Sequence, residues 1–177
     1  MRPDHIVQAA RPGPPGRAAG YHRPAMKRSA GLLMFRHTGP DLEVLLAHPG
    51  GPFWRHKDLG AWTIPKGEFA EPESALEAAQ REFTEETGFP VVPPLLALGD
   101  IVQKSGKRIS AWAFEGDCDP AQLRSNEFEM EWPPRSGRRQ RYPEIDRVGW
   151  FGLPQARRKV LPAQSALLDR LELVLGL

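Results

Sequence analysis

The chain has 177 residues, of which 40% are hydrophobic and 26% are charged, a balance typical of one globular domain. Its formal net charge of +2 is too small to indicate a protein that wraps nucleic acid or a polybasic membrane anchor. Cys118 is the only cysteine, which excludes an internal disulfide and a cysteine-rich zinc site. No apolar run approaches the roughly 20 residues of a membrane-spanning helix, and no secretory signal is recognisable. We therefore expect a cytoplasmic protein with no membrane partner.

Residues 1–25 are rich in proline, glycine and arginine and contain little periodic apolar sequence. This composition predicts a disordered extension, to which we assign no function. Met26 stands directly before a strand-like run, so translation could equally start there. Residues 26–177 form the expected domain.

Short apolar runs at residues 29–35 and 42–47 are separated by a turn-rich segment, which predicts a hairpin. A loop rich in glycine and proline follows at residues 48–60 and carries aromatic and basic groups. Residues 61–64 are predicted to return as a strand that leads to Lys66 and Gly67. Because the loop ends beside an acidic segment, it is a candidate functional loop.

The acidic segment is predicted to form a helix over residues 72–87, bounded by a proline that suits the first position and by a glycine that suits the C-terminal stop. At about 100° per residue, Leu76, Ala79 and Phe83 share an apolar face. Three carboxylates lie beside that face: Glu82, Glu85 and Glu86.

Like charges on one helical turn repel, at about 3 kcal/mol per pair at roughly 5 Å in a partly dry site. Arg81 lies four residues from both Glu77 and Glu85 and can reach them, but it cannot neutralise the whole cluster. A hard divalent cation such as Mg²⁺ or Mn²⁺ can, because it prefers carboxylate and carbonyl oxygens. The alternative is a solvated acidic helix face, which the spacing alone disfavours only modestly.

Beyond the helix, the pattern continues as strands followed by helices. Residues 95–103 and 108–114 predict a second hairpin, and the alternation of acidic and apolar residues at 126–132 predicts a half-exposed strand. The last predicted elements are a strand at 147–151, a short helix at 154–159 and an amphipathic helix at 162–175. Strands on both sides of a helix indicate a mixed α/β domain.

The acidic segment resembles the Nudix box position by position. The matching residues are Gly67, Glu73, Arg81, Glu82, Phe83, Glu85, Glu86, Gly88 and Phe89. From about Lys27 onward, the chain also resembles bacterial MutT-like predicted pyrophosphohydrolases. The resemblance implies an α/β/α sandwich around a mixed β-sheet, with a loop-helix-loop catalytic motif.

The same resemblance implies that divalent metals are held by Glu82, Glu85, Glu86 and the main-chain carbonyl of Lys66. It implies that Arg81 belongs to the catalytic set and, like Glu73, mainly orients carboxylates. Gly67 and Gly88 are expected to serve backbone geometry, consistent with the access of glycine to positive φ.

Hydrolysis also needs a base, which in this superfamily is either a box glutamate or a later carboxylate. Residues 142–146 resemble the Pro-Glu loop that supplies a late catalytic or metal-binding glutamate in some members, so Glu144 is the first candidate for both roles. A solvent-facing loop charge is the equally weighted alternative. Glu131 and Asp146 are weaker candidates.

Substrate phosphates require cations, and a nucleobase requires an aromatic surface. The candidate substrate-binding residues are Lys66, Arg55, Lys57, Phe53 and Trp54. A basic segment before Glu144 is either an electrostatic funnel or a solvated flexible loop; it contains Arg135, Arg138, Arg139 and Arg141. Four other tryptophans are expected in the core: Trp62, Trp112, Trp132 and Trp150.

The implied function is that of a divalent-metal-dependent Nudix pyrophosphohydrolase that cleaves a diphosphate bond in a nucleotide. Nucleoside triphosphates and dinucleoside polyphosphates are the expected substrates, and 5′-triphosphate RNA is an alternative. No stable nucleic-acid partner is expected, and the chain is either a monomer or a homodimer. A non-catalytic nucleotide-sensing module is the second alternative, although such modules commonly lose the glutamates that this chain keeps.

Overall fold

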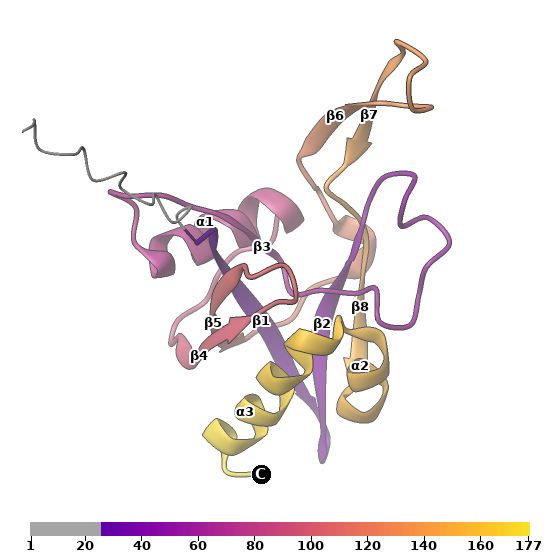
Figure 1. Cartoon of the computed structure of the whole chain (residues 1–177). Helices are drawn as coiled ribbons and strands as arrows, with labels where there is room; N and C mark the ends of the chain where they lie inside the picture. The colour runs from indigo at the N-terminus through magenta and orange to yellow at the C-terminus, as the bar shows by residue number, and fades with distance from the viewer. Residues whose placement is uncertain (1–25) are drawn as a thin grey trace, which may run out of the picture.

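The computed structural model describes residues 26–177, and the predicted extension over residues 1–25 lies outside the described residues. The main sheet contains six strands: β1 (Arg28–Thr38), β2 (Asp41–Pro49), β3 (Lys66–Glu68), β4 (Leu96–Val102), β5 (Arg108–Glu115) and β8 (Ile145–Gly152). The order is β4-β5-β1-β2-β8, and β3 pairs with β1 outside this path (Figure 1). β1 and β5 run parallel while the other pairs are antiparallel, so the sheet is mixed.

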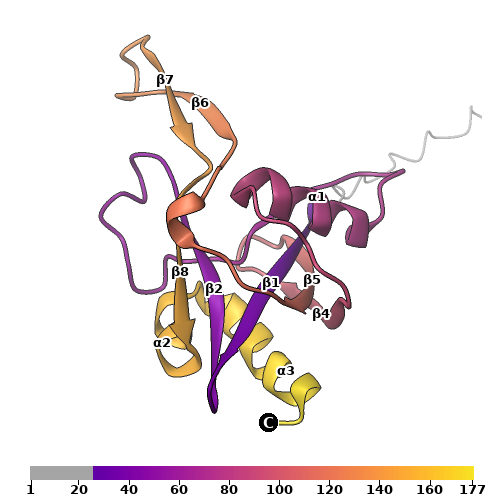
Figure 2. The same cartoon turned by 180° about the vertical axis from the view of Figure 1, so that it is seen from behind.

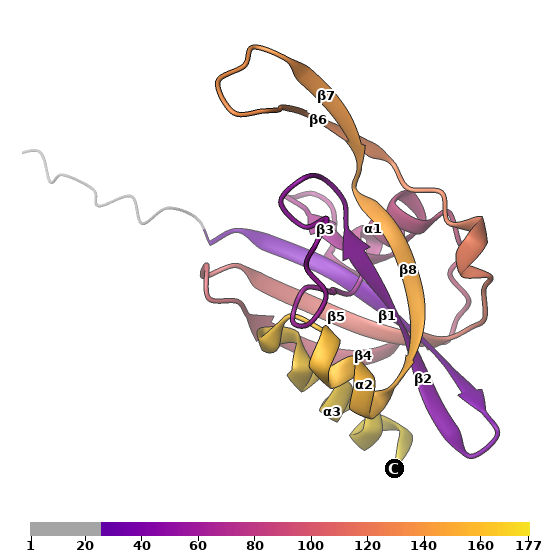
Figure 3. The same ribbon diagram turned by 90° about the vertical axis from the view of Figure 1, so that its right-hand side faces the viewer.

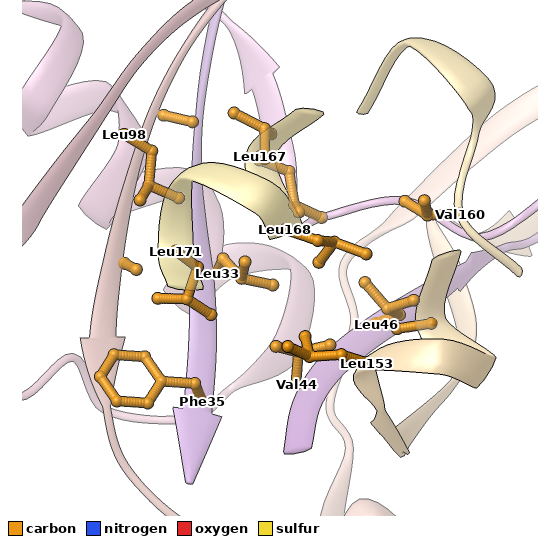
Figure 4. Packing of buried hydrophobic residues seen from close by; sticks show 14 of the residues in the cluster. Leu33, Phe35, Val44, Leu46, Leu98, Leu153, Val160, Leu167, Leu168 and Leu171 are labelled. Atoms are coloured by element: carbon orange, nitrogen blue, oxygen red, sulfur yellow. The ribbon is translucent and has the colours of Figure 1, made fainter. Parts of the chain in front are cut away.

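Helices cover both faces of this sheet. They are α1 (Ala75–Thr87), α2 (Leu153–Lys159) and α3 (Ser165–Leu175), with short 3₁₀ helices at Pro120–Gln122 and Pro162–Gln164. Alternate side chains of β1 face opposite layers, as the period of a strand requires. Leu32 and Met34 pack with Phe83 of α1, whereas Leu33 and Phe35 pack with α2 and α3 (Figure 4). The expected α/β/α sandwich is confirmed.

A second, two-stranded sheet consists of β6 (Glu127–Glu131) and β7 (Arg139–Pro143). Figure 3 shows this hairpin standing beyond the main sheet, with β7 running into β8. Figures 1 and 2 show the loop between β2 and β3 at the same end of the molecule. The hairpin and this loop therefore flank one end of the sheet.

The acidic helix begins three residues later than predicted, at Ala75 rather than Pro72. Ser74 is the N-cap: its side chain accepts a hydrogen bond from the Glu77 amide, and the Glu77 carboxylate accepts one from the Ser74 amide. This reciprocal capping box fixes the start of the helix more strongly than proline at the first position. Gly88 ends the helix in the left-handed conformation, at φ 74°, as predicted.

The predicted apolar face of this helix is partly wrong. Ala79 and Phe83 are buried as expected, but Leu76 is 36% exposed. Although Leu76 and Phe83 share an angular position, they lie seven residues and about 10 Å apart along the helix axis. In the first turn it is Ala75, rather than Leu76, that packs against the core.

The predicted strand at residues 61–64 is also wrong. Trp62 and Thr63 form only isolated bridges, to Val160 and Ala47 respectively, and the strand begins at Lys66. Both predicted hairpins and the strand at 147–151 are confirmed, within one to three residues at their ends. The predicted C-terminal helix is divided into a 3₁₀ turn and α3.

Candidate active site

Glu82 lies directly over Gly67, the middle residue of β3, which pairs with Ala30 of β1. A β-carbon at position 67 would lie 2.0 Å from Cδ of Glu82, far inside van der Waals contact. Gly67 does not have a positive φ, so the expected reason for this glycine is wrong. Its role is to leave space for the Glu82 carboxylate, whereas Gly88 does require the left-handed conformation.

Arg81 gathers three carboxylates around one guanidinium. It contacts Glu73 twice, with Nε 2.7 Å from Oε1 and Nη2 3.0 Å from Oε2. Its Nη1 lies 2.7 Å from Oε1 of Glu82 and 3.1 Å from Oε2 of Glu85. The expected contact with Glu85 is present, but the one with Glu77 is absent because Glu77 is occupied in the capping box. Hydrogen bonds from Arg81 hold the pKa of Glu73 below its usual value.

Glu86 is the buried member of the acidic cluster. Its Oε2 accepts a hydrogen bond of 2.9 Å from the backbone amide of Lys66. Burial raises the pKa of Glu86 to about 8, and the negative charges of Glu82 and Glu144 add to this effect, while Lys66 opposes it. The helix therefore holds a buried acid whose ionised form lacks sufficient compensation.

Glu144 lies between β7 and β8, beside the acidic helix. Burial raises its pKa, the charge of Glu82 adds to the shift, and Lys66 opposes it. Its backbone is held from two sides, because the Gly50 amide donates to the Glu144 carbonyl and the Glu144 amide donates to the Asn126 carbonyl, each at 2.9 Å. The structure thus brings Glu144 close enough to Glu82 and Glu86 for their charges to interact.

The hairpin is also tied directly to the acidic helix. The backbone amide of Asn126, just before β6, donates to the carbonyl of Glu85 at 3.0 Å. The two weaker candidates for the base have other partners: Glu131 accepts from the Gly137 amide, and Asp146 contacts His48. Of the late carboxylates predicted as a base, only Glu144 faces the acidic cluster.

The candidate substrate residues of the β2–β3 loop have unequal surroundings. Phe53 is 60% exposed and meets the ring of Trp132 edge to face, with ring centroids 5.2 Å apart. Trp54 is half-buried against the core, and Nζ of Lys57 lies 4.9 Å from the centroid of its ring. Arg55 is exposed, and within residues 26–177 it has no acidic partner at ion-pair distance. Phe53 is therefore the available aromatic surface.

Trp132 was expected in the core and instead lies half-exposed at the end of β6. The apolar face of the hairpin turns toward the loop, because Phe128 approaches Gly51 and Trp132 approaches Phe53. The other predicted core tryptophans are buried or packed against the core. The alternation that predicted β6 places Trp132 on the same face as Phe128. The apolar face of a two-stranded hairpin must pack on another part of the chain, so this pattern could have indicated that Trp132 lies outside the main core.

The basic segment before Glu144 is divided between the hairpin turn and strand β7. Arg139 and Arg141 belong to β7, where both pair with Glu129 across the hairpin. Arg135, at φ 62°, and Arg138 lie near the hairpin tip without an acidic partner at ion-pair distance among the described residues. Cross-strand pairing therefore leaves fewer cations for a ligand than the sequence indicates.

The carboxylates of α1 have the oxygen chemistry that a hard divalent cation requires. Within the described part of the chain, however, no three acidic, histidine or cysteine side chains already converge as a metal site. Glu82 and Glu85 turn toward Arg81, and Glu86 turns toward the Lys66 amide. The donor set fits a divalent cation in kind, and such a cation would stabilise the ionised form of Glu86 that burial disfavours.

None of the helices between residues 26 and 177 combines the length and the apolar character that crossing a bilayer demands.

Comparison with known proteins gives the same fold for solved structures from several organisms. A C. elegans Ap4A hydrolase in a binary complex matches with a TM-score of 0.59 at 20% identity, covering 84% of this chain and 98% of that one. The NUDIX domain of Shewanella oneidensis NrtR, complexed with ADP ribose, matches with a TM-score of 0.58 at 18% identity, covering 85% and 89%. A MutT protein from Methanosarcina mazei Go1 matches with a TM-score of 0.54 at 20% identity, covering 83% and 93%. At these identities, the similarity shows the fold alone.

The family comparison covers most of the sequence. The model of the NUDIX domain matches residues 25–171, which include the acidic helix, the β2–β3 loop and the hairpin. The chain therefore belongs to the Nudix hydrolase superfamily.

Proposed function

We propose that the protein is a divalent-metal-dependent pyrophosphohydrolase that cleaves a diphosphate bond in a nucleoside triphosphate or a dinucleoside polyphosphate. The observation that carries this proposal is the acidic cluster of α1, in which Glu86 is buried beside Glu82 and within electrostatic reach of Glu144. Burial of several carboxylates together is costly unless a cation joins them. A purely structural role for these carboxylates would not require this free-energy cost of burial.

Glu82, Glu85 and Glu86, with the Lys66 carbonyl, would hold Mg²⁺ or Mn²⁺. When bound, such a cation neutralises phosphate oxygens and lowers the pKa of a water molecule. Arg81 keeps Glu82 and Glu85 on one side of the helix, and its guanidinium can release one carboxylate while it retains Glu73. Because Gly67 has no side chain, the carboxylate of Glu82 can pack directly against β3.

Glu144 is the proposed general base. A base must reach the attacking water and must have a pKa near the working pH, and burial beside Glu82 raises the pKa of Glu144. Its backbone contacts with Gly50 and Asn126 hold it between the loop and the hairpin. A carboxylate held on a fixed backbone can orient a water molecule without a large entropic cost.

The nucleotide is proposed to bind across the β2–β3 loop, with phosphates near Lys66, Arg55 and Lys57. Phe53 would stack on a base, because it is the exposed aromatic ring of this loop and Trp132 supports its edge. Trp54 would add a half-buried wall beside Lys57. Nucleotide-type ligands also occur in the structural neighbours, which include an Ap4A hydrolase and an ADP-ribose complex.

A second candidate substrate is 5′-triphosphate RNA. It is favoured by Arg135 and Arg138, which stand near the hairpin tip without acidic partners at ion-pair distance within residues 26–177. Cations in this position could contact phosphates beyond the first nucleotide. The second candidate requires the same acidic cluster.

The test is a panel of nucleoside triphosphates, dinucleoside polyphosphates, nucleotide sugars and triphosphorylated RNA, assayed with and without Mg²⁺ or Mn²⁺. The expected result is metal-dependent release of a nucleoside phosphate from one class. A preference for triphosphorylated RNA that disappears after Arg135→Ala with Arg138→Ala would favour the second candidate. Absence of turnover throughout the panel would contradict catalysis and would leave a nucleotide-sensing module.

A further inference from the structure

His48, at the end of β2, is a fully buried histidine with both ring nitrogens engaged. Its side chain is 0% exposed. Nδ1 lies 2.8 Å from Oδ1 of Asp146, and Nε2 lies 2.7 Å from the backbone carbonyl of Lys57. The ring of Trp62 packs against it edge to face, with centroids 5.2 Å apart. No role in the proposed chemistry has so far been given to this residue.

The partners of His48 determine the hydrogen-bonding role of each of its ring nitrogens. A backbone carbonyl can only accept a hydrogen bond, so Nε2 donates to Lys57. The carboxylate of Asp146 also accepts, so Nδ1 donates as well. The ring therefore bridges a carboxylate on one side and a backbone carbonyl on the other.

The other charged groups near this pair lie on β8, in the β2–β3 loop and at the end of α2. Arg147 contacts Asp146 at 3.4 Å, and both Arg147 and Lys159 stand over the ring of Trp62. The indole nitrogen of Trp62 donates to Asp58, which Lys159 also contacts. Asp146 is thus the acid in direct contact with the ring, and Arg147 is the residue of β8 that pairs with His48 across the sheet.

The two partners of His48 belong to the two segments that flank the proposed active site. Lys57 lies in the β2–β3 loop that carries Phe53, and Asp146 lies two residues after Glu144. The register between β2 and β8 shifts directly after His48, where Pro49 pairs with Ile145. The amide of Gly50 then donates to the Glu144 carbonyl at 2.9 Å.

Gly50 makes this junction possible through close packing. A β-carbon at position 50 would lie 1.9 Å from the Pro143 carbonyl oxygen, so the loop and the hairpin end approach each other as closely as their backbones permit. The side chain of His48 makes one hydrogen bond to each of these two segments, to the Lys57 carbonyl and to the Asp146 carboxylate. A side chain outside the acidic cluster therefore joins these two segments in addition to their backbone contacts.

We propose that His48 is a positioning residue that clamps the substrate loop, through Lys57, to the strand that presents Glu144, through Asp146. This inference rests on the proposed function, in which the loop binds the nucleotide and Glu144 is the base. The hydrogen bond to Lys57 orders the substrate loop and should therefore affect mainly KM. The hydrogen bond to Asp146 orders the strand that presents Glu144 and should therefore affect mainly kcat.

Two conservative variants separate these two hydrogen bonds. The amide nitrogen of asparagine can occupy the position of Nδ1, so His48→Asn keeps the donor to Asp146 and loses the one to Lys57. The amide nitrogen of glutamine can occupy the position of Nε2, so His48→Gln keeps the donor to Lys57 and loses the one to Asp146. Thr63→Val is the matched control, because Thr63 is also buried and hydrogen-bonded, but to Gln164 of the 3₁₀ turn before α3.

Hydrogen–deuterium exchange tests the clamp without reference to activity. We expect about tenfold faster exchange or more over residues 51–57 in His48→Asn, and over residues 142–147 in His48→Gln, with α1 unchanged in both. Exchange like that of Thr63→Val in both variants would overturn the proposal.

Kinetics test whether the clamp serves catalysis. We expect His48→Asn mainly to raise KM and His48→Gln mainly to lower kcat, each on the order of tenfold. Combining His48→Gln with Glu144→Gln should reduce kcat by less than the product of the single effects, because both act on the same carboxylate. Equal and multiplicative losses would overturn the positioning role. If wild type hydrolyses no substrate in the panel, the proposed function fails, and the exchange measurement still decides whether the clamp exists.

Discussion

Gly67 lies so close to the carboxylate of Glu82 that a side chain at position 67 would overlap with it. The carboxyl carbon of Glu82 lies 2.0 Å from the position of a β-carbon on Gly67. A strand residue therefore determines where the carboxylate of a helix residue can lie. The atom that would have to move is at the end of a flexible side chain, so the conflict concerns the position of the carboxylate more than the stability of the fold.

Gly67→Ala should reduce turnover by about a hundredfold, because it displaces Glu82 by a large fraction of its contact distance. The free energy of unfolding should change by less than about 1 kcal/mol, since Glu82 can rotate away. Gly152→Ala is the matched control: Gly152 has no atom within 4 Å of its added β-carbon. Steady-state kinetics and urea unfolding check both variants. Full activity in Gly67→Ala would contradict the role of this contact.

Arg81→Ala should lower kcat by about tenfold to a hundredfold, because Glu73, Glu82 and Glu85 lose their shared partner. Arg81→Lys should restore little of this activity, since an ammonium group cannot make the paired contacts of a guanidinium. The control is Arg157→Ala, which removes an arginine that also joins two acids, Asp169 and Glu172, between α2 and α3. Equal losses of kcat in both alanine variants would show a general effect on stability.

Phe53→Ala should raise KM about tenfold and leave kcat nearly unchanged, because base stacking contributes about 1–3 kcal/mol per base. The free energy of unfolding should change by no more than about 0.5 kcal/mol, since Phe53 is 60% exposed. Leu59→Ala provides the control on the same loop, because Leu59 is 62% exposed. A change in kcat alone, or the same KM in both variants, would exclude Phe53 from nucleotide binding.

Cys118 should react slowly with iodoacetamide at pH 8. Burial raises the pKa of its thiol to about 11, and the charge of Asp117 adds to the shift. The reactive thiolate is therefore scarce below that pH, and the reaction should be on the order of a hundredfold slower than for an ordinary thiol. The rate should rise with pH toward 11. Mass spectrometry of folded and urea-unfolded protein checks this, and equal rates at pH 8 would contradict the folded-state shift.

The acidic helix could be predicted from the sequence because its geometry is local. Glu82, Glu85 and Glu86 lie on one helical turn whatever the rest of the chain does. The contact between Glu82 and Gly67 could not be predicted in this way, since a close approach between a strand and a helix depends on tertiary packing. Leu76 shows the same limit, because its angular position was correct but its place along the axis determined its exposure.

The hairpin β6–β7 was only half predicted. Alternation identified the first strand, but the second strand is rich in arginine and has the composition of a solvated loop. It is a strand because Arg139 and Arg141 pair with Glu129 across the hairpin, which is a contact between residues about ten positions apart. The aromatic pair of Phe53 and Trp132 depends on this hairpin and could not be identified before it.

The central claim is that the carboxylates of α1 support metal-dependent hydrolysis. The direct measurement is turnover of the best substrate against Mg²⁺ concentration for wild type, for Glu85→Gln combined with Glu86→Gln, and for Glu115→Gln as a control at the end of β5. The account predicts saturable metal dependence in wild type and the control, with a loss of at least about a thousandfold in the double variant. Full metal-dependent turnover in the correctly folded double variant would contradict it.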